Sequence, residues 1–333
     1  MANRKILLIG GAGYVGSVTG EEMANDGKYE IVVLDNLYEG HREAVHPAAT
    51  FIEGSMADEK LLNEIFAEHK FDGVMHFAGE TVIEYSMTNP FRYFNANIVD
   101  GMKILNAMVK HGVKDFIFSS TSAVYGEAEE IPMPETHRKE PANSYGQSKW
   151  IFEQILKWYH QIHGLRSVSF RYFNAAGASE QYGEAHKSES HLIPLVLQVA
   201  LGQRKEISIY GDNYPTRDGT CVRDYTHVID LARAHIAGLE NLDKYPFDAF
   251  NLGNGDGYTV REVIEAAREV TGHPIPAKIT PRRAGDAAVM VASSQKAKDL
   301  LGWKPRYPLI RDIVKTAWDW HQTHPHGYSK SYS

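Results

Sequence analysis

The residues best suited to acid–base chemistry in this sequence are Tyr145 and Lys149, which stand four positions apart. Residues at that spacing share one face of a helix, so the lysine ammonium can lie beside the tyrosine oxygen. A nearby positive charge lowers the pKa of a phenol, which is about 10 in an isolated tyrosine. We therefore expect Lys149 to lower the pKa of Tyr145 and to make its phenol a usable general base.

Hydroxyl side chains precede this pair along the chain. Ser119, Ser120 and Thr121 end an extended run that begins at Lys114, and Ser122 follows them. A hydroxyl at Thr121 or Ser122 can cap the end of that strand, or it can hydrogen-bond the oxygen from which Tyr145 takes a proton. The residues by themselves leave both roles open.

A glycine-rich segment is the second candidate site. Gly10, Gly13 and Gly16 follow the pattern G-x-x-G-x-x-G, after a short apolar run and at the start of a helical pattern. Glycines in that place allow a tight turn and bring a pyrophosphate close to the helix N-terminus. Asp35 ends the next apolar run, 19 residues beyond Gly16. Because a carboxylate there binds ribose hydroxyls and repels a 2′-phosphate, the sequence predicts an NAD site rather than an NADP site.

The elements that would position these residues alternate between strands and helices. Strands are expected at residues 5–10, 30–34, 50–53, 71–77, 114–119 and 167–170, and helices at 14–25, 60–69, 90–111 and 144–164. This alternation predicts an α/β fold with a Rossmann-like doubly wound parallel sheet, covered by helices on both faces.

The regular alternation of strand and helix patterns ends after Arg171. Helices are expected at 191–202, 227–241, 259–271, 294–301 and 309–323, and strands at 206–210 and 249–252. We expect an NAD-binding domain of residues 1–171 plus about 225–252. A smaller, interleaved C-terminal α/β substrate domain would then take about 172–224 plus 253–333.

Composition excludes several classes of protein. The 333 residues carry a net charge of −7, so nucleic acid and anionic membranes are not expected partners. The single cysteine, Cys221, excludes an internal disulfide and a cysteine-rich zinc site. Arg4 and Lys5 precede an uncharged run as in a signal peptide, but glycines interrupt that run, and we expect a cytoplasmic protein.

Several short motifs occur together and in order along nearly the whole chain. They are GGAGYVG at 10–16, HFAG at 76–79, SSTSAVYG at 119–126, Tyr145 with Lys149, RYFNAAG at 171–177, CVRDYTHV at 221–228, NLG at 251–253, RRAGD at 282–286 and WDWHQTHPHGY at 318–328. With these motifs the chain resembles the extended short-chain dehydrogenases/reductases, and within them the family of UDP-glucose 4-epimerases.

The resemblance implies an isomerase that uses NAD to interconvert UDP-glucose and UDP-galactose through a 4-keto intermediate. Tyr145 would be the base, Thr121 would share the hydrogen bond to the sugar oxygen, and Lys149 would hold the nicotinamide ribose. The implied cofactor residues are Gly10, Gly13, Tyr14, Val15, Gly16, Asp35, Asn36, Ser55, Met56, Phe77, Ala78, Gly79, Ser119, Lys149 and Tyr172. The implied substrate residues are Thr121, Tyr145, Asn174, His191, Leu192, Ser208, Tyr210, Arg223, Arg283, Asp286 and Met290.

Some positions depart from the family pattern. Thr81, Ser55 and Ala96 stand where a lysine, an aspartate and an asparagine are usual, which bears on how firmly NAD is held. Met290 stands where a bulky tyrosine excludes N-acetylated sugars from some members, so UDP-GlcNAc/GalNAc is an alternative substrate pair.

Other functions stay open beside this one. UDP-xylose/arabinose epimerisation and a non-catalytic NAD-binding scaffold are further alternatives. A 4,6-dehydratase is not expected, because Ser122 and Ala123 follow Thr121 where that activity needs an acidic pair.

Two last expectations concern assembly and metals. The family expectation is a homodimer through the helices near 90–111 and 144–164. No metal site is expected: His321, His324 and His326 have no cysteine or carboxylate pattern beside them and are interpreted as a solvated helix end.

Overall fold

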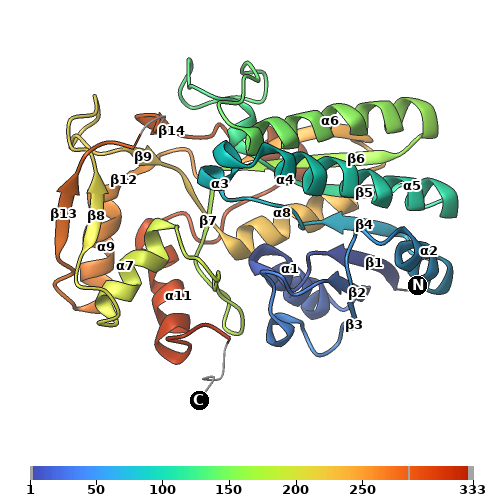
Figure 1. Cartoon of the computed structure of the whole chain (residues 1–333), viewed down its shortest axis with the longest axis horizontal. Coiled ribbons are helices and arrows are strands. Elements are labelled where there is room, and N and C mark those ends of the chain that lie inside the picture. Colours follow the sequence, from blue (N-terminus) through green and yellow to red (C-terminus); the bar gives the residue numbers. More distant parts are fainter. Residues whose placement is uncertain (1–2, 284–285, 329–333) are drawn as a thin grey trace.

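The centre of the molecule is a seven-stranded sheet in the order β11-β6-β5-β4-β1-β2-β3, and every pair in it is parallel (Figure 1). The computed structural model describes residues 3–283 and 286–328. The strands of this sheet are β1 (Arg4–Ile9), β2 (Tyr29–Asp35), β3 (Thr50–Glu53), β4 (Gly73–His76), β5 (Asp115–Thr121), β6 (Arg166–Tyr172) and β11 (Phe247–Leu252). The Rossmann-like fold class predicted from the sequence is confirmed.

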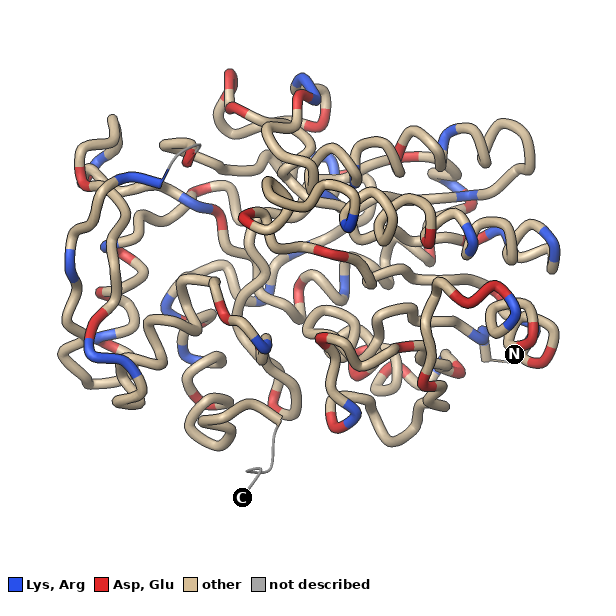
Figure 2. Tube along the Cα trace, in the orientation of Figure 1, with Lys and Arg blue, Asp and Glu red and all other residues tan. Residues whose placement is uncertain are grey.

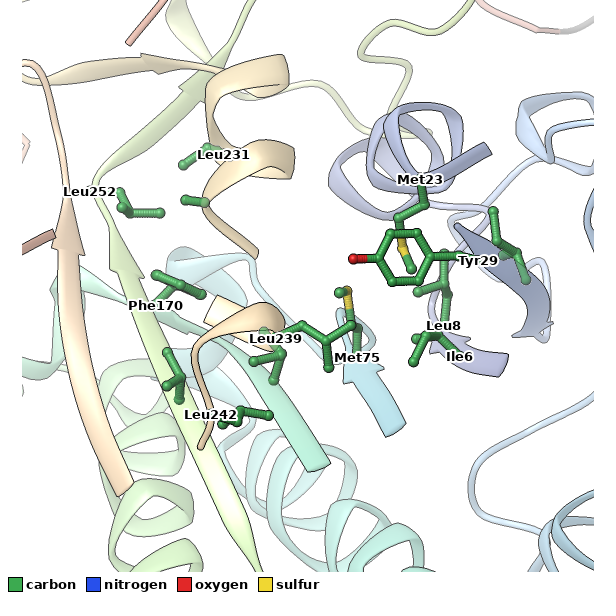
Figure 3. Packing of buried hydrophobic residues seen from close by; sticks show 14 of the residues in the cluster. Ile6, Leu8, Met23, Tyr29, Met75, Phe170, Leu231, Leu239, Leu242 and Leu252 are labelled. Atoms are coloured by element: carbon green, nitrogen blue, oxygen red, sulfur yellow. The ribbon is translucent and has the colours of Figure 1, made fainter. Parts of the chain in front are cut away.

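Helices cover both faces of this sheet because its strands are apolar on both sides. Along β1, Ile6 and Leu8 point into one core, and Leu7 and Ile9 point into the other. The first core is closed by α1 (Tyr14–Asp26), α8 (Val228–Glu240) and α10 (Gln295–Leu301), and the second by α2 (Glu59–His69), α5 (Gly101–His111) and α6 (Ser144–His163). Figure 3 shows Met23 of α1 lying against Tyr29 in the first core.

A second, smaller region is built from elements of the last 160 residues or so and lies to the left in Figure 1. Its own apolar core joins three helices to a two-stranded parallel sheet. These elements are α7 (Leu192–Ala200), α9 (Val260–Thr271), α11 (Ile310–Thr323), β8 (Ile207–Tyr210) and β13 (Ala277–Thr280). The capping box predicted at Thr259 and Glu262 is present at the start of α9.

Short strands link this region to the central sheet. They are β7 (Asn174–Ala176), paired with β10 (Tyr225–His227), and β9 (Val222–Arg223), which lies between β12 (Tyr258–Thr259) and β14 (Val289–Met290). β9 and β10 flank Asp224, a buried carboxylate that accepts backbone N–H bonds from Asn254, Gly255 and Ala292. This carboxylate therefore ties the segment Arg223–Tyr225 to the loop after β11 and to the residues after β14.

The helix expected over 90–111 is interrupted in its middle. It consists of α4 (Pro90–Phe94), a π-helical segment η2 (Asn95–Asp100) and α5. The wider turn of a π-helix often lies at a functional site. Short elements were not expected from the sequence. The missed helices are α3 (Ile83–Thr88) and the 3-10 helices η1 (Arg42–Ala44) and η3 (Ser122–Val124), and the missed strands are β7, β9, β10, β12, β13 and β14.

The C-terminal histidines differ from their interpretation as a solvated helix end. His321 on α11 is buried, and His324 stacks on Trp320 with ring centroids 4.6 Å apart. The indole rings of α11 cover them, so the expectation was wrong for His321. Of the helices in residues 3–283 and 286–328, none has the length and apolar character needed to cross a membrane.

Candidate active site

The glycine loop lies where the strand order reverses, between the carboxyl ends of β1 and β4. Gly10 has a φ of +79°, and a Cβ there would lie 2.5 Å from the backbone nitrogen of Ala78, the second residue after β4. A Cβ on Gly16 would lie 2.4 Å from the carbonyl oxygen of Gly10. Only glycine fits these two positions, and the crevice at such a switch point is where this kind of sheet binds ligands.

Helix α1 begins at this loop with Gly13 as its N-cap, which offers no capping side chain, and with no acidic residue in the first turn. The positive end of the helix is therefore open to an anion. The side-chain-free turn at Gly10 and Gly16, together with this uncapped helix end, fits the diphosphate of NAD.

Asp35 ends β2 beside this loop. Its carboxylate accepts hydrogen bonds from Ala12 N at 3.0 Å and from Leu37 N at 2.9 Å. Burial raises the pKa of Asp35, and the two backbone bonds act in the opposite direction. The carboxylate thus joins the turn after β2 to the glycine loop.

The other predicted cofactor residues follow the carboxyl ends of neighbouring strands. Asn36 follows β2, Ser55 and Met56 follow β3, and Phe77, Ala78 and Gly79 follow β4. Ser119 in β5 and Tyr172 at the end of β6 are hydrogen-bonded through their hydroxyls. The fold therefore brings this set to one edge of the sheet.

Thr121, Tyr145 and Lys149 meet at the same edge. Thr121 is the last residue of β5, and Tyr145 and Lys149 lie in the first turns of α6. The Thr121 hydroxyl lies close enough to the Tyr145 phenol to act on its pKa. Lys149 is buried and donates to the carbonyl oxygen of Ser119 at 3.0 Å. The hydroxyl, phenol and ammonium that the sequence selected are thus neighbours, and Thr121 also accepts the Ala123 N–H at 3.1 Å as a strand-end cap.

The pKa of Tyr145 differs from the expectation. Burial raises it above the ordinary value of a phenol, the neighbouring Tyr172 adds to the increase, and the Thr121 hydroxyl opposes it. The lysine ammonium is directed at a backbone carbonyl, and the expected net lowering of the Tyr145 pKa is wrong. Burial also lowers the pKa of Lys149 to about 8, and Glu153 opposes that change.

Asn97 is a residue of this site that the sequence did not single out. Its side chain is buried, accepts a hydrogen bond from Glu80 N at 2.8 Å and donates to Ser148 Oγ at 2.9 Å. A Cβ on Gly79 would lie 2.6 Å from its amide oxygen and 3.5 Å from Lys149 Nζ. The π-helical segment η2 turns the Asn97 side chain inward, and the sequence gives no signal for a π-helix. The family pattern places its asparagine one position earlier, at Ala96.

The predicted substrate residues gather on the second region. Arg223 pairs with Asp286 at 3.4 Å, and the Arg283 guanidinium lies over the Tyr210 ring, 3.8 Å from its centre. Lys and Arg follow the outer strand β13 and the loop after it (Figure 2). Met290 lies opposite Arg223 in the β9–β14 pair.

Met290 also connects this group to the catalytic strand. It packs against a small cluster that contains Val124 and Tyr125, three and four residues after Thr121. The β9–β14 pair and the end of β5 are therefore neighbours across the junction of the two regions.

The remaining substrate residues are spread more widely. Asn174 donates to the carbonyl oxygen of Asp224 at 2.7 Å, and Ser208 lies in β8 two residues before Tyr210. Leu192 begins α7. His191 precedes it, with its Nδ1 2.7 Å from a carboxylate oxygen of Glu184. The Nδ1 of His191 is therefore engaged by the protein itself.

Known proteins are similar to this chain in sequence. A model described as the NAD dependent epimerase/dehydratase family matches residues 6–253. A curated UDP-glucose 4-epimerase from Halalkalibacterium halodurans is 49% identical over 327 residues, 97% of this chain and 97% of that protein. The resemblance drawn from the ordered motifs is confirmed.

Solved structures agree with the sequence comparison. A crystal structure of a UDP-glucose 4-epimerase has a TM-score of 0.96 at 48% identity and covers 98% of this chain and 100% of its own. The UDP-glucose 4-epimerase from Bifidobacterium longum in complex with NAD+ and UDP has a TM-score of 0.92 at 39% identity, covering 97% and 100%.

Proposed function

This chain belongs to the NAD dependent epimerase/dehydratase family, and on that premise we propose that it is an isomerase, an NAD-dependent UDP-glucose 4-epimerase that interconverts UDP-glucose and UDP-galactose with Tyr145 as the base. The observation that carries the proposal is that Thr121 at the end of β5 lies beside Tyr145 and the buried Lys149 in the first turns of α6, at the sheet edge that holds the glycine loop. The full-length similarity to UDP-glucose 4-epimerases supports the substrate pair.

The chemistry at the sugar carbon is a proton transfer coupled to a hydride transfer. Tyr145 accepts the proton of the sugar 4-hydroxyl, and Thr121 holds the same oxygen by a hydrogen bond. NAD would supply the acceptor for the C4 hydride and would return that hydride to the other face of the 4-keto sugar, and its positively charged ring would favour the ionised phenol. Tyr145 would then give the proton back to the same sugar oxygen.

The raised pKa of Tyr145 makes this assignment conditional on positive charge. A phenol that burial keeps neutral becomes a base only when a cation stands nearby. Lys149, whose pKa of about 8 leaves most of its ammonium protonated at neutral pH, supplies part of that charge. Its bond to the Ser119 carbonyl holds it between the end of β5 and Gly79.

Substrate binding is assigned to the second region. Arg223 and Arg283 would hold the diphosphate, because the planar guanidinium offers paired donors. Asp286 would bind the ribose hydroxyls, and Ser208 and Tyr210 would line the uracil pocket. Asn174, Leu192 and His191 would contact the sugar side, His191 through its Nε2 because its Nδ1 faces Glu184.

Met290 favours a second substrate pair. It is a flexible, unbranched side chain in β14 beside Arg223, on the side that meets the catalytic strand. A site bounded there by methionine can admit an acetamido group, so UDP-GlcNAc/GalNAc is the second candidate.

The catalytic assignment is tested with Tyr145→Phe and a matched control on the same helix, Tyr159→Phe. Tyr145→Phe removes the base, so we expect kcat to fall by about 10²–10⁴-fold while bound NAD stays unchanged. Tyr159 donates its hydroxyl to Asn106, outside the site, and its variant should keep wild-type turnover. Epimerisation of UDP-galactose and the NAD content of the purified proteins are measured. Full activity of Tyr145→Phe would reject the assigned base.

The sugar is identified by separate incubations with UDP-galactose, UDP-GlcNAc and UDP-xylose. We expect turnover of UDP-galactose, and turnover of UDP-GlcNAc that falls selectively in Met290→Tyr. NAD binding without turnover of any of the three would instead support the scaffold function.

A further inference from the structure

Two histidines and two glutamates converge in the segment that leads into α7. Glu184, His186, Glu189 and His191 follow the spacing E-x-H-x-x-E-x-H, and one side-chain ligand atom from each lies within 4.8 Å of all the others. The Glu184 and Glu189 side chains are only 5% and 8% exposed. Two nearly buried carboxylates side by side need a compensating positive charge.

We propose that these four residues form a site for a divalent transition-metal ion, with zinc as the best-matched metal. Carboxylate and imidazole ligands bind zinc at about 2.0–2.2 Å and in a tetrahedron, so two ligand atoms on one ion are roughly 3.3–3.4 Å apart. Three of the four histidine–glutamate pairs have that separation, and the fourth, His191 Nδ1 to a Glu184 oxygen, is shorter at 2.7 Å. His186 Nδ1 lies 3.4 Å from a Glu184 oxygen and 3.3 Å from a Glu189 oxygen, and His191 Nδ1 lies 3.3 Å from the other Glu189 oxygen.

The donor set selects the class of metal. Imidazole nitrogens favour zinc and its neighbours in the first transition row, whereas magnesium and calcium prefer oxygen ligands alone. Two neutral imidazoles and two carboxylates also balance the charge of a divalent ion.

The segment is held in place from several directions, as a preformed site requires. Gly183 N donates to Tyr328 Oη at 3.0 Å, and His41 Nε2 lies 2.8 Å from the carbonyl oxygen of Ala185. One Glu189 oxygen accepts the N–H groups of Ser190 and His191 at 2.7 Å each. The ligands are therefore fixed by contacts that do not involve the ion.

The position of the site indicates what the ion would do. The segment lies between α11 and α1 before it enters α7 (Figure 1). The ring of His186 meets the edge of Tyr14, the first residue of α1, with centroids 6.5 Å apart. His191 is followed by Leu192, which we assign to the substrate side. An ion here would tie the start of α7 to the glycine loop, so its role is structural and it does not touch the reacting carbon.

The test measures metal binding and is independent of catalysis. Full-length protein is stripped with EDTA and titrated with ZnCl2, and bound zinc is counted by mass spectrometry after desalting. We expect one zinc per chain, and at least a tenfold loss of affinity in both His186→Ala and His191→Ala. His326→Ala, an exposed histidine outside the cluster, is the matched control and should bind as the wild type does.

Two further readouts separate a metal site from a pair of histidine–glutamate ion pairs. Cobalt in place of zinc should give the intense visible absorption of a tetrahedral Co²⁺ ion, absent in His191→Ala. Zinc should slow tryptic cleavage after Lys187, which is exposed within the segment, in the wild type but not in His191→Ala. His191 is itself more than half exposed, so its variant should fold. Zinc bound equally by the wild type and both cluster variants, or not bound at all, would overturn the proposal, whatever the epimerase assay shows.

Discussion

Single atoms decide whether the glycine loop can hold a dinucleotide. At Gly16, a Cβ would meet the backbone of Gly10 at 2.4 Å and that of Gly11 at 2.8 Å, and neither can move without opening the turn. At Gly20, one helical turn later, a Cβ would lie 3.4 Å from a methyl carbon of Leu8, an ordinary contact. The same substitution therefore has different consequences at two positions of one helix.

We expect Gly16→Ala to weaken NAD binding by tenfold or more and Gly20→Ala to leave it unchanged. Both variants gain helix propensity of about 1 kcal/mol, so that term cancels in the comparison. The measurement is the NAD content of the purified proteins together with the dissociation constant after NAD is removed. Equal NAD retention by the two variants would show that the close approach at Gly16 does not shape the cofactor site.

At the scale of elements, the interior of the second core contains a histidine where an apolar residue would be usual. His76 ends β4 and lies among the rings of Phe116, Phe118 and Phe152, at 6.1, 5.8 and 6.0 Å between centroids. Burial lowers the pKa of His76 to about 3, and its Nδ1 has no hydrogen-bond partner among the described residues. Below pH 6.5 the unfolded chain binds a proton that the folded chain does not, so stability is lost as the pH falls from about 6.5 toward 3.

His76→Phe should remove this acid sensitivity. A pKa difference of this size costs the wild type roughly 2 kcal/mol at pH 5 and almost nothing at pH 7.5. The free energy of unfolding of the variant minus that of the wild type should thus be about 2 kcal/mol larger at pH 5 than at pH 7.5, because the variant is relatively more stable at the lower pH. Denaturant unfolding at the two pH values measures it, with the exposed His163→Phe on α6 as control. A difference independent of pH would contradict the prediction.

The alternation of apolar runs and helical patterns predicted the elements of the parallel sheet closely. Strand 50–53 and the helix at 144–164 agree with the structure to within a residue, because both are set by local periodicity and clear end signals. The π-helical turn at η2 has no such signal, and Asn97 was missed with it. A local sequence pattern also cannot show that side chains of two different elements are buried against each other. Arg171 of β6 and Glu153 of α6 form a buried ion pair at 2.5 Å that no spacing indicates.

The sequence could predict which candidate side chains come together at one sheet edge, but not their electrostatics. The ordered motifs selected Thr121, Tyr145 and Lys149, and the fold brings them together. The direction of the pKa change at Tyr145 depends on the burial of its phenol and on Tyr172 of β6. Neither can be inferred from the spacing of Tyr145 and Lys149 in the sequence. The Glu184–His191 cluster was missed for a similar reason, since its spacing matches no common zinc pattern and only the folded segment shows its convergence.

At the scale of the whole molecule, the domain boundaries and the cytoplasmic location stay predictions. Strand β11, residues 247–252, lies at the edge of the central sheet although it follows β8 to β10 in the chain. An interleaved pair of domains would have such a strand. Limited proteolysis that cuts near 172–190 without releasing a folded N-terminal fragment would support interleaving.

The homodimer can be argued from the surface of α4, α5 and α6. These helices lie side by side on one face of the molecule (Figure 1), and Tyr159 of α6 donates to Asn106 of α5 at 2.6 Å. Large apolar side chains on them point outward, with Phe91 77% exposed and Trp158 62% exposed. Exposed aromatic residues gathered on one face are typical of protein interfaces. This is the face through which the family resemblance implies a dimer, and we propose a two-fold pair of copies packed on it.

We expect Trp158→Glu to convert the dimer into a monomer, because a charge in the middle of a desolvated apolar interface has no partner across a two-fold axis. Light scattering coupled to size exclusion should give twice the chain mass of 37.4 kDa for the wild type and the single mass for the variant. Leu309→Glu introduces the same charge at a residue 57% exposed that precedes α11, away from α6, and should remain dimeric. If Trp158→Glu kept the wild-type mass while Leu309→Glu became monomeric, the interface would lie on the second region, and the outward rings of α4 and α6 would need another partner.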